Sequence, residues 1–174
     1  MPTVILDPLP LEIDELLYRR RKLGLDNADE MWKGVLHVNP APRGRHGEIL
    51  QQLAELFGPL ARAAGLVPAM ADFNLGAQGD YRVPDGGLHH PEEADDRLYY
   101  STAALVVEIV SPDDESWAKL PFYAAHYVDE VLIVDPQKRE VHWFVLQGDH
   151  YEPIERSGLI ELGPKELAER IEWA

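Results

Sequence analysis

The spacing of hydrophobic residues divides the chain into helices and strands. In residues 46–64, apolar side chains from Ile49 to Ala64 recur at intervals of three and four, which predicts an amphipathic helix. Leucines at similar spacing in residues 11–23, followed by Gly24, predict a shorter helix near the start of the chain. Both helices need an apolar surface to pack against.

Strand patterns supply that surface. Residues 103–110 and 131–136 are short and almost wholly apolar, which is typical of buried strands. Further strands are expected at residues 32–38, in two or three pieces between residues 66 and 88, and in a meander at residues 140–146 and 150–154. Helices are expected to begin at Pro121 and near Pro164, because proline fits the first turn of a helix. These elements predict an α/β (α+β) fold, a mixed β-sheet flanked by helices, as one domain spanning residues 1–174.

The composition fits a soluble globular protein. Hydrophobic residues make up 45% of the 174 residues and charged residues 27%. The chain has no cysteine, which excludes disulfides and cysteine-ligated zinc or iron–sulfur sites. No apolar run approaches the roughly 20 residues that span a bilayer, and the first residues lack a secretory signal pattern. A cytoplasmic protein without membrane contact is expected.

The charge limits the choice of partners. The 16 lysines and arginines against 31 acidic residues give a formal net charge of −15. A field of this sign repels nucleic acids at long range, so a DNA substrate would require local basic groups or bound cations. The simpler interpretation of the acidity is that it keeps the protein soluble.

One acidic residue interrupts a buried strand. In residues 103–110, strand alternation puts Leu105, Val107 and Ile109 on one face and Glu108 on the other, with valines on both sides of it. A buried carboxylate costs several kcal/mol unless it is paired. Glu108 therefore requires a basic side chain, a bound metal, or a pKa high enough to keep it neutral.

Two further residues could meet Glu108. Asp85, in the sequence RVPDGGL, lies at a predicted strand end, and two carboxylates on neighbouring strands can bind magnesium or manganese. Lys119 follows the turn after Glu108 and could reach back to it. A metal site and a structural pair between Glu108 and a lysine or arginine are equally consistent with this spacing.

At this point the sequence resembles a known family. The segments VPD at 83–85, EIVSP at 108–112, KLPFYA at 119–124 and VDEVLIVDP at 128–136 are similar to the bacterial Uma-type restriction endonucleases of the PD-(D/E)XK nuclease superfamily. The resemblance covers roughly residues 10–155. It implies a restriction-endonuclease-like core and a metal-dependent endonuclease that hydrolyses DNA.

The resemblance also implies roles for individual residues. Asp85 and Glu108 would bind Mg²⁺ or Mn²⁺, with the carbonyl of Ile109 as a third ligand, and Asp85, Glu108 and Lys119 would be catalytic. Lys119 would replace the lysine usually found two residues after the glutamate. His46 would be an accessory residue near the site.

Other interpretations stay open. The chain could be a non-catalytic module that binds nucleic acid or protein, or a metal-dependent hydrolase of a small phosphorylated compound, which an acidic surface tolerates better. Association as a homodimer is also left open. His89 and His90 could contribute to a zinc site, although the surrounding charges favour a solvated loop. Tyr99 and Tyr100 could stack on bases, although packing is the more common role for such residues.

Overall fold

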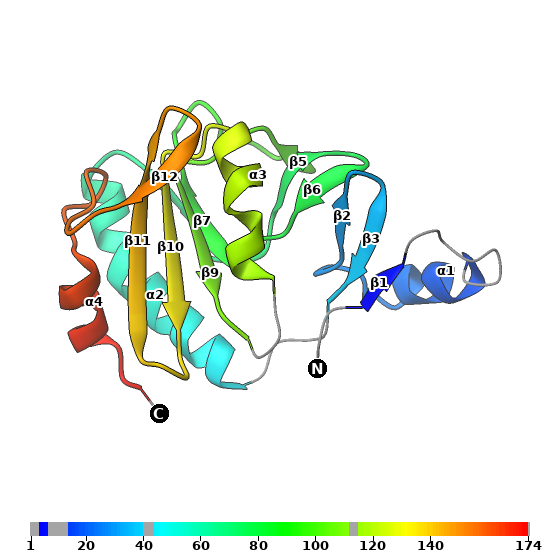
Figure 1. Cartoon of the computed structure of the whole chain (residues 1–174), viewed down its shortest axis with the longest axis horizontal. Coiled ribbons are helices and arrows are strands. Elements are labelled where there is room, and N and C mark those ends of the chain that lie inside the picture. The colour runs from blue at the N-terminus through cyan, green and yellow to red at the C-terminus, as the bar shows by residue number, and fades with distance from the viewer. Residues whose placement is uncertain (1–3, 7–13, 40–43, 112–114, 174) are drawn as a thin grey trace.

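The protein is built from two β-sheets and the helices that cover them (Figure 1). The computed structural model describes residues 4–6, 14–39, 44–111 and 115–173, and each sheet contains six strands within these residues. The expected mixed sheet with flanking helices is confirmed, with the difference that the strands divide between two sheets.

The sheet that carries Glu108 forms the centre of the molecule. Its strands follow the order β12 (His150–Pro153), β11 (Glu140–Gln147), β10 (Glu130–Asp135), β9 (Leu105–Ile109), β7 (Gly86–His89) and β4 (Val67–Ala69). The two central strands, β9 and β10, are parallel, and the other pairs are antiparallel. Every residue of β9 and β10 is buried, because both faces of the sheet are covered.

Helices cover this sheet on opposite faces (Figure 1). The helices α2 (Gly44–Ala63) and α4 (Pro164–Arg170) share one hydrophobic core with Leu105, Val107 and Ile109 of β9. The short helix η2 (Ser116–Lys119) and α3 (Leu120–Ala125) lead from β9 to β10, and α3 packs with Val106 on the other face. The alternation predicted for residues 103–110 and the packing of the helix near residue 46 are therefore confirmed.

The helix α1 (Asp14–Lys22) lies apart from the central sheet, beside the smaller sheet (Figure 1). Its basic last turn pairs with nearby acids, as in the contact between Arg20 and Asp29 at 2.9 Å. Among the described residues, no helix has the length and apolar character needed to cross a membrane.

The smaller sheet contains two strands where the sequence predicted one strand at residues 32–38. Its strands follow the order β1 (Val4–Leu6), β3 (Val35–Val38), β2 (Glu30–Trp32), β6 (Asp80–Arg82), β5 (Asn74–Ala77) and β8 (Tyr99–Tyr100). A single strand at residues 32–38 is wrong, because Lys33 and Gly34 have φ angles of 50° and 87° and turn the chain into the β2–β3 hairpin. The region between residues 66 and 88 contains four strands rather than two or three.

Two glycines allow the chain after Asp85 to approach its neighbours closely. Gly86 pairs with Val107 of β9, which confirms the predicted contact between the strand next to Asp85 and the strand of Glu108. A Cβ atom on Gly87 would overlap the carbonyl oxygen of Leu105. The Gly-Gly sequence therefore permits the strand pairing that places Asp85 next to the end of β9.

Candidate active site

The carboxylate of Glu108 is buried against a lysine. Only 3% of Glu108 is exposed, and the Nζ atom of Lys119 lies 3.1 Å from each of its carboxylate oxygens. The hydroxyl of Tyr123, on α3, donates a hydrogen bond to Oε1 of the same carboxylate. Glu108 therefore has a basic side chain as its partner. This is one of the three possibilities that the sequence left open for a buried carboxylate in β9.

Lys119 has a second carboxylate partner from the smaller sheet. Its Nζ atom lies 2.8 Å from Oε1 of Glu30, at the start of β2. Glu30 is 1% exposed and also accepts hydrogen bonds from the backbone N–H of Val83 at 2.9 Å and the indole N–H of Trp32 at 2.7 Å. Lys119 therefore connects the two sheets through one ammonium group.

Asp85 is held beside this group by three contacts. Its Oδ1 atom accepts a hydrogen bond from the ring N–H of His46 at 2.8 Å, and its Oδ2 atom accepts one from the backbone N–H of Ile109 at 2.7 Å. Its own backbone N–H donates to the carbonyl of Val107 at 3.1 Å. The Asp85 side chain is 20% exposed, so this carboxylate, unlike that of Glu108, can be reached from solvent.

Negative charge concentrates in this part of the protein. Burial, together with the charges of Asp85 and Glu30, raises the pKa of Glu108 to about 8 against the opposing effect of Lys119. Burial and the charge of Asp85 also raise the pKa of Asp72. Burial alone would lower the pKa of Lys119, but Glu108 and Glu30 outweigh it and raise that pKa well above its usual value. Lys119 is therefore an ammonium ion at neutral pH.

The donor atoms fit a hard divalent cation. Four carboxylates, those of Glu30, Asp72, Asp85 and Glu108, interact electrostatically around one lysine. Carboxylate oxygens are the ligands that magnesium and manganese prefer, and Asp85 keeps acceptor capacity beyond its two hydrogen bonds. Among the described residues, no group of three or more His, Asp or Glu side chains is arranged to hold a metal ion. A cation bound by Asp85 and Glu108 would need backbone oxygen and water to complete its coordination, as is common for magnesium.

The structure brings the predicted site residues together. Asp85, Ile109 and His46 form one hydrogen-bonded group, and Lys119 donates hydrogen bonds to Glu108, whose pKa the nearby charge of Asp85 helps to raise. Three neighbours of this group, Glu30, Asp72 and Tyr123, were not among the site residues predicted from the sequence. Glu30 sits in an acidic stretch typical of a solvated loop, and Tyr123 in an ordinary apolar helix pattern, so neither gave a signal.

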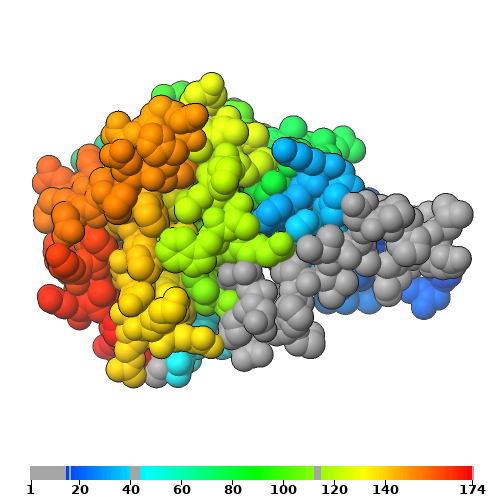
Figure 2. Space-filling model, in the orientation of Figure 1, coloured from blue at the N-terminus to red at the C-terminus, as the bar shows by residue number. Residues whose placement is uncertain are grey.

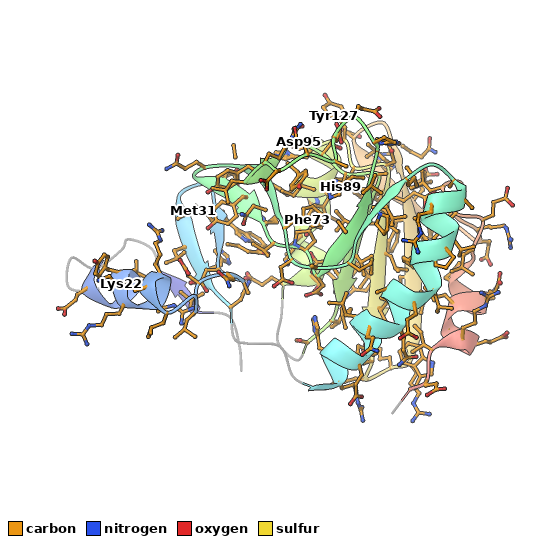
Figure 3. All side chains as sticks on the ribbon, turned by 180° about the vertical axis from the view of Figure 1, so that it is seen from behind. Lys22, Met31, Phe73, His89, Asp95 and Tyr127 are labelled. Atoms are coloured by element: carbon orange, nitrogen blue, oxygen red, sulfur yellow. The ribbon has the colours of Figure 1, made fainter. Side chains whose placement is uncertain are left out.

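The histidines and tyrosines that were considered for other roles are packed elsewhere. His89 is buried in β7, where its ring meets Phe73 at 4.8 Å and Tyr100 at 4.5 Å between centroids, and Figure 3 shows it near Phe73. His90 instead contacts Asp129 at 2.8 Å. His89 therefore lies in a buried strand rather than in the expected solvated loop, and the packing role of Tyr100 is confirmed.

Comparison with known proteins places this fold among related proteins. A crystal structure titled as that of a putative nuclease from Anabaena variabilis has the same fold, with a TM-score of 0.67 and 16% sequence identity over 83% of this chain and 92% of that chain. The model of the Uma2 family, described as "Putative restriction endonuclease", matches residues 16–171. The chain belongs to the Uma2 family, as its sequence motifs indicated. A comparison with curated proteins gave no match.

Proposed function

We propose that this protein is a metal-dependent phosphodiesterase that cleaves DNA internally. The observation that carries the proposal is the placement of two carboxylates, Asp85 and Glu108, beside an ammonium group at the end of a central strand. These two carboxylates would hold Mg²⁺ or Mn²⁺, with the carbonyl of Ile109 as a further ligand. Membership of a family described as "Putative restriction endonuclease" supports the nuclease reaction.

Each residue of the site has a distinct role in this proposal. The bound metal would supply Lewis-acid chemistry, neutralising the phosphate and lowering the pKa of a coordinated water. Lys119 stabilises negative charge on the phosphoryl group, and because its own pKa is raised it does not act as the base. His46 orients Asp85, and Glu30 and Tyr123 hold Lys119 and Glu108 in place.

A second candidate is hydrolysis of a small phosphorylated compound by the same groups. The net charge of −15 favours it, because a small substrate meets less repulsion than a DNA duplex. A binding module without catalysis would use the same fold and would bind its partner without turnover.

Manganese binding tests the site separately from the reaction. Adding manganese should raise the melting temperature of the native protein by mass action, by an amount equivalent to about 2.7 kcal/mol at 100 times the Kd. Asp85→Asn and Glu108→Gln should lose most of this shift. Asp129→Asn is a matched control, because Asp129 makes the same 2.8 Å contact with a histidine, His90, away from the site. Equal shifts in all four proteins would contradict the assigned ligands.

Cleavage assays then distinguish the functions. The native protein with magnesium or manganese should cut supercoiled, linear or single-stranded DNA, and the Asp85→Asn and Glu108→Gln variants should not. Hydrolysis of small phosphodiesters without DNA cleavage would support the second candidate. Metal binding without turnover on any of these substrates would support the binding module.

A further inference from the structure

An aromatic side chain stands at the surface close to the proposed catalytic lysine. Trp117 belongs to the same short helix as Lys119 and is 41% exposed, and it is the only exposed tryptophan of the four, all of which lie in the described part of the chain. Its ring meets His142 and Phe144 of β11 edge to face, at 5.1 and 6.1 Å between centroids. These contacts hold the indole in place while much of it stays open to solvent.

Strand register places this indole on the same side of the sheet as Glu108. Ile133 of β10 pairs with Glu108 on one side and with His142 on the other, so these three side chains share one face. Neighbouring strands lie about 4.8 Å apart, which puts His142 about 10 Å from Glu108 across two strands. Figure 2 shows the yellow-green η2–α3 segment on this face beside the yellow β10–β11 segment. The exposed indole, which contacts His142, thus lies on the same face of the sheet as Glu108, about two strand spacings away along the sheet.

The chemistry of an exposed indole selects unpaired bases. Bases stack on aromatic side chains through their flat faces, and such stacking is worth about 1–3 kcal/mol per base. In a duplex these faces are covered by neighbouring base pairs, so they are free only in single strands, loops and frayed ends. We propose that Trp117 is a stacking site for an unpaired base next to the cleaved phosphate, and that the preferred substrate is single-stranded DNA. This inference rests on the proposed function and names its substrate class.

The charge of the protein makes stacking important for recognition. With 31 acidic and 16 basic residues, the protein gains less from phosphate contacts than a basic nuclease does. Stacking requires no basic side chain. It can therefore contribute affinity for DNA in a protein whose net negative charge weakens phosphate binding. Because every base has a flat face, binding by stacking should depend little on the base sequence of the DNA.

Binding without turnover tests this inference. Fluorescence anisotropy of a labelled oligothymidylate is measured in millimolar calcium, with electrophoresis to verify that the oligonucleotide is intact. Trp117→Ala should weaken binding roughly 10- to 100-fold, whereas Trp117→Phe should retain most of the affinity. Tyr127→Ala is the control, because Tyr127 is 75% exposed but follows the C-terminal end of α3, whereas Lys119 precedes its N-terminal end. Thermal denaturation checks that each variant is folded.

Two additional measurements separate stacking from phosphate contacts. On an oligonucleotide of the same length made of abasic sites, Trp117→Ala should bind as the native protein does. The slope of log affinity against log salt concentration should also be unchanged, because no phosphate contact is lost. An equal loss on the abasic strand, an unchanged affinity for oligothymidylate, or a native protein that prefers duplex would overturn the inference.

The results also separate this inference from the proposed reaction. Trp117-dependent binding by a protein that cuts no DNA would support the stacking site and contradict the nuclease. Metal-dependent cleavage with no contribution from Trp117 would support the nuclease and contradict the stacking site.

Discussion

At the scale of single residues, the feature that most constrains the chemistry is the double pairing of Lys119. A lysine with one carboxylate neighbour could lose a proton in a buried setting, whereas Glu108 and Glu30 together hold the ammonium form. In the proposed reaction, Lys119 would therefore act by its charge and its position rather than as a base. Its pairing with Glu108 also means that the same side chain stabilises the fold and, in the proposed reaction, would stabilise charge on the substrate.

Removal of the lysine should destabilise the fold as well as abolish activity. We expect Lys119→Met to cost about 3–5 kcal/mol, because it removes the cation and hydrogen-bond donor that the buried side chains of Glu108 and Glu30 share. Thermal denaturation measures the loss. Lys138→Met is the control, since Lys138 is 64% exposed and its pair with Asp135 should contribute less than about 1 kcal/mol. Adding Glu30→Gln to Lys119→Met should restore part of the stability, and a further loss would contradict the buried pairing.

The raised pKa of Glu108 predicts a dependence of stability on pH. Between the ordinary value of 4.5 and about 8, the folded protein holds a proton on Glu108 that the unfolded chain has released. The stability contributed by this group therefore falls as the pH rises through that interval, by at most about 1.4 kcal/mol per pH unit.

Chemical denaturation of the metal-free protein at several pH values checks this prediction against Glu108→Gln, which cannot titrate there. The difference in free energy of unfolding between the two proteins should shift in favour of the variant as the pH rises from 5 to 8. A difference that is constant over this range would mean that Glu108 is ionised throughout. Manganese should reduce the pH dependence of the native protein, because a bound cation favours the ionised carboxylate.

At the scale of elements, sequence periodicity correctly predicted the helices and strands in which burial sets the order of apolar and polar residues. The alternation in β9 and the apolar face of α2 both follow from packing on the central sheet, and the structure has both. The β2–β3 hairpin was missed because its turn residues, Lys33 and Gly34, lack the Asn-Gly or Asp-Gly signal of such turns. Glu30 was missed with it, since the partner that makes it a site residue is 89 positions further along the chain. Pairings of this kind depend on tertiary contacts that local patterns do not contain.

The approach of β7 to β9 can be tested at one glycine. Gly87→Ala should destabilise the protein by about 1–3 kcal/mol, because the new methyl group overlaps the carbonyl oxygen of Leu105 and separates the strands. It should also reduce the stabilisation by manganese, since Asp85 is aligned by this pairing.

Gly47→Ala provides the control for this variant. Gly47 lies in α2 with no atom within 4 Å of an added Cβ, so alanine should be neutral or stabilising by up to about 1 kcal/mol. Equal behaviour of the two variants in thermal denaturation would contradict the importance of the close approach.

At the scale of the whole molecule, the net charge of −15 opposes the encounter with DNA. Divalent cations would then have two functions, one in the site and one in screening the repulsion. We expect kcat/KM for DNA to continue rising at magnesium concentrations that already saturate the site in thermal-shift measurements. With a small, singly charged phosphodiester as substrate, kcat/KM should level off at saturation. Parallel curves for the two substrates would show that screening has no part in the reaction.

The bridge that Lys119 makes between the two sheets has a consequence for the newly made chain. Glu30 is synthesised early and Lys119 much later, and each belongs to a different layer of the finished protein. The ammonium group can reach its final place only when the hairpin has docked against the central strands. In the proposed reaction, hydrolytic competence would therefore arrive only with the completed tertiary structure, and a partly folded polypeptide on the ribosome would not yet cleave the nucleic acids around it.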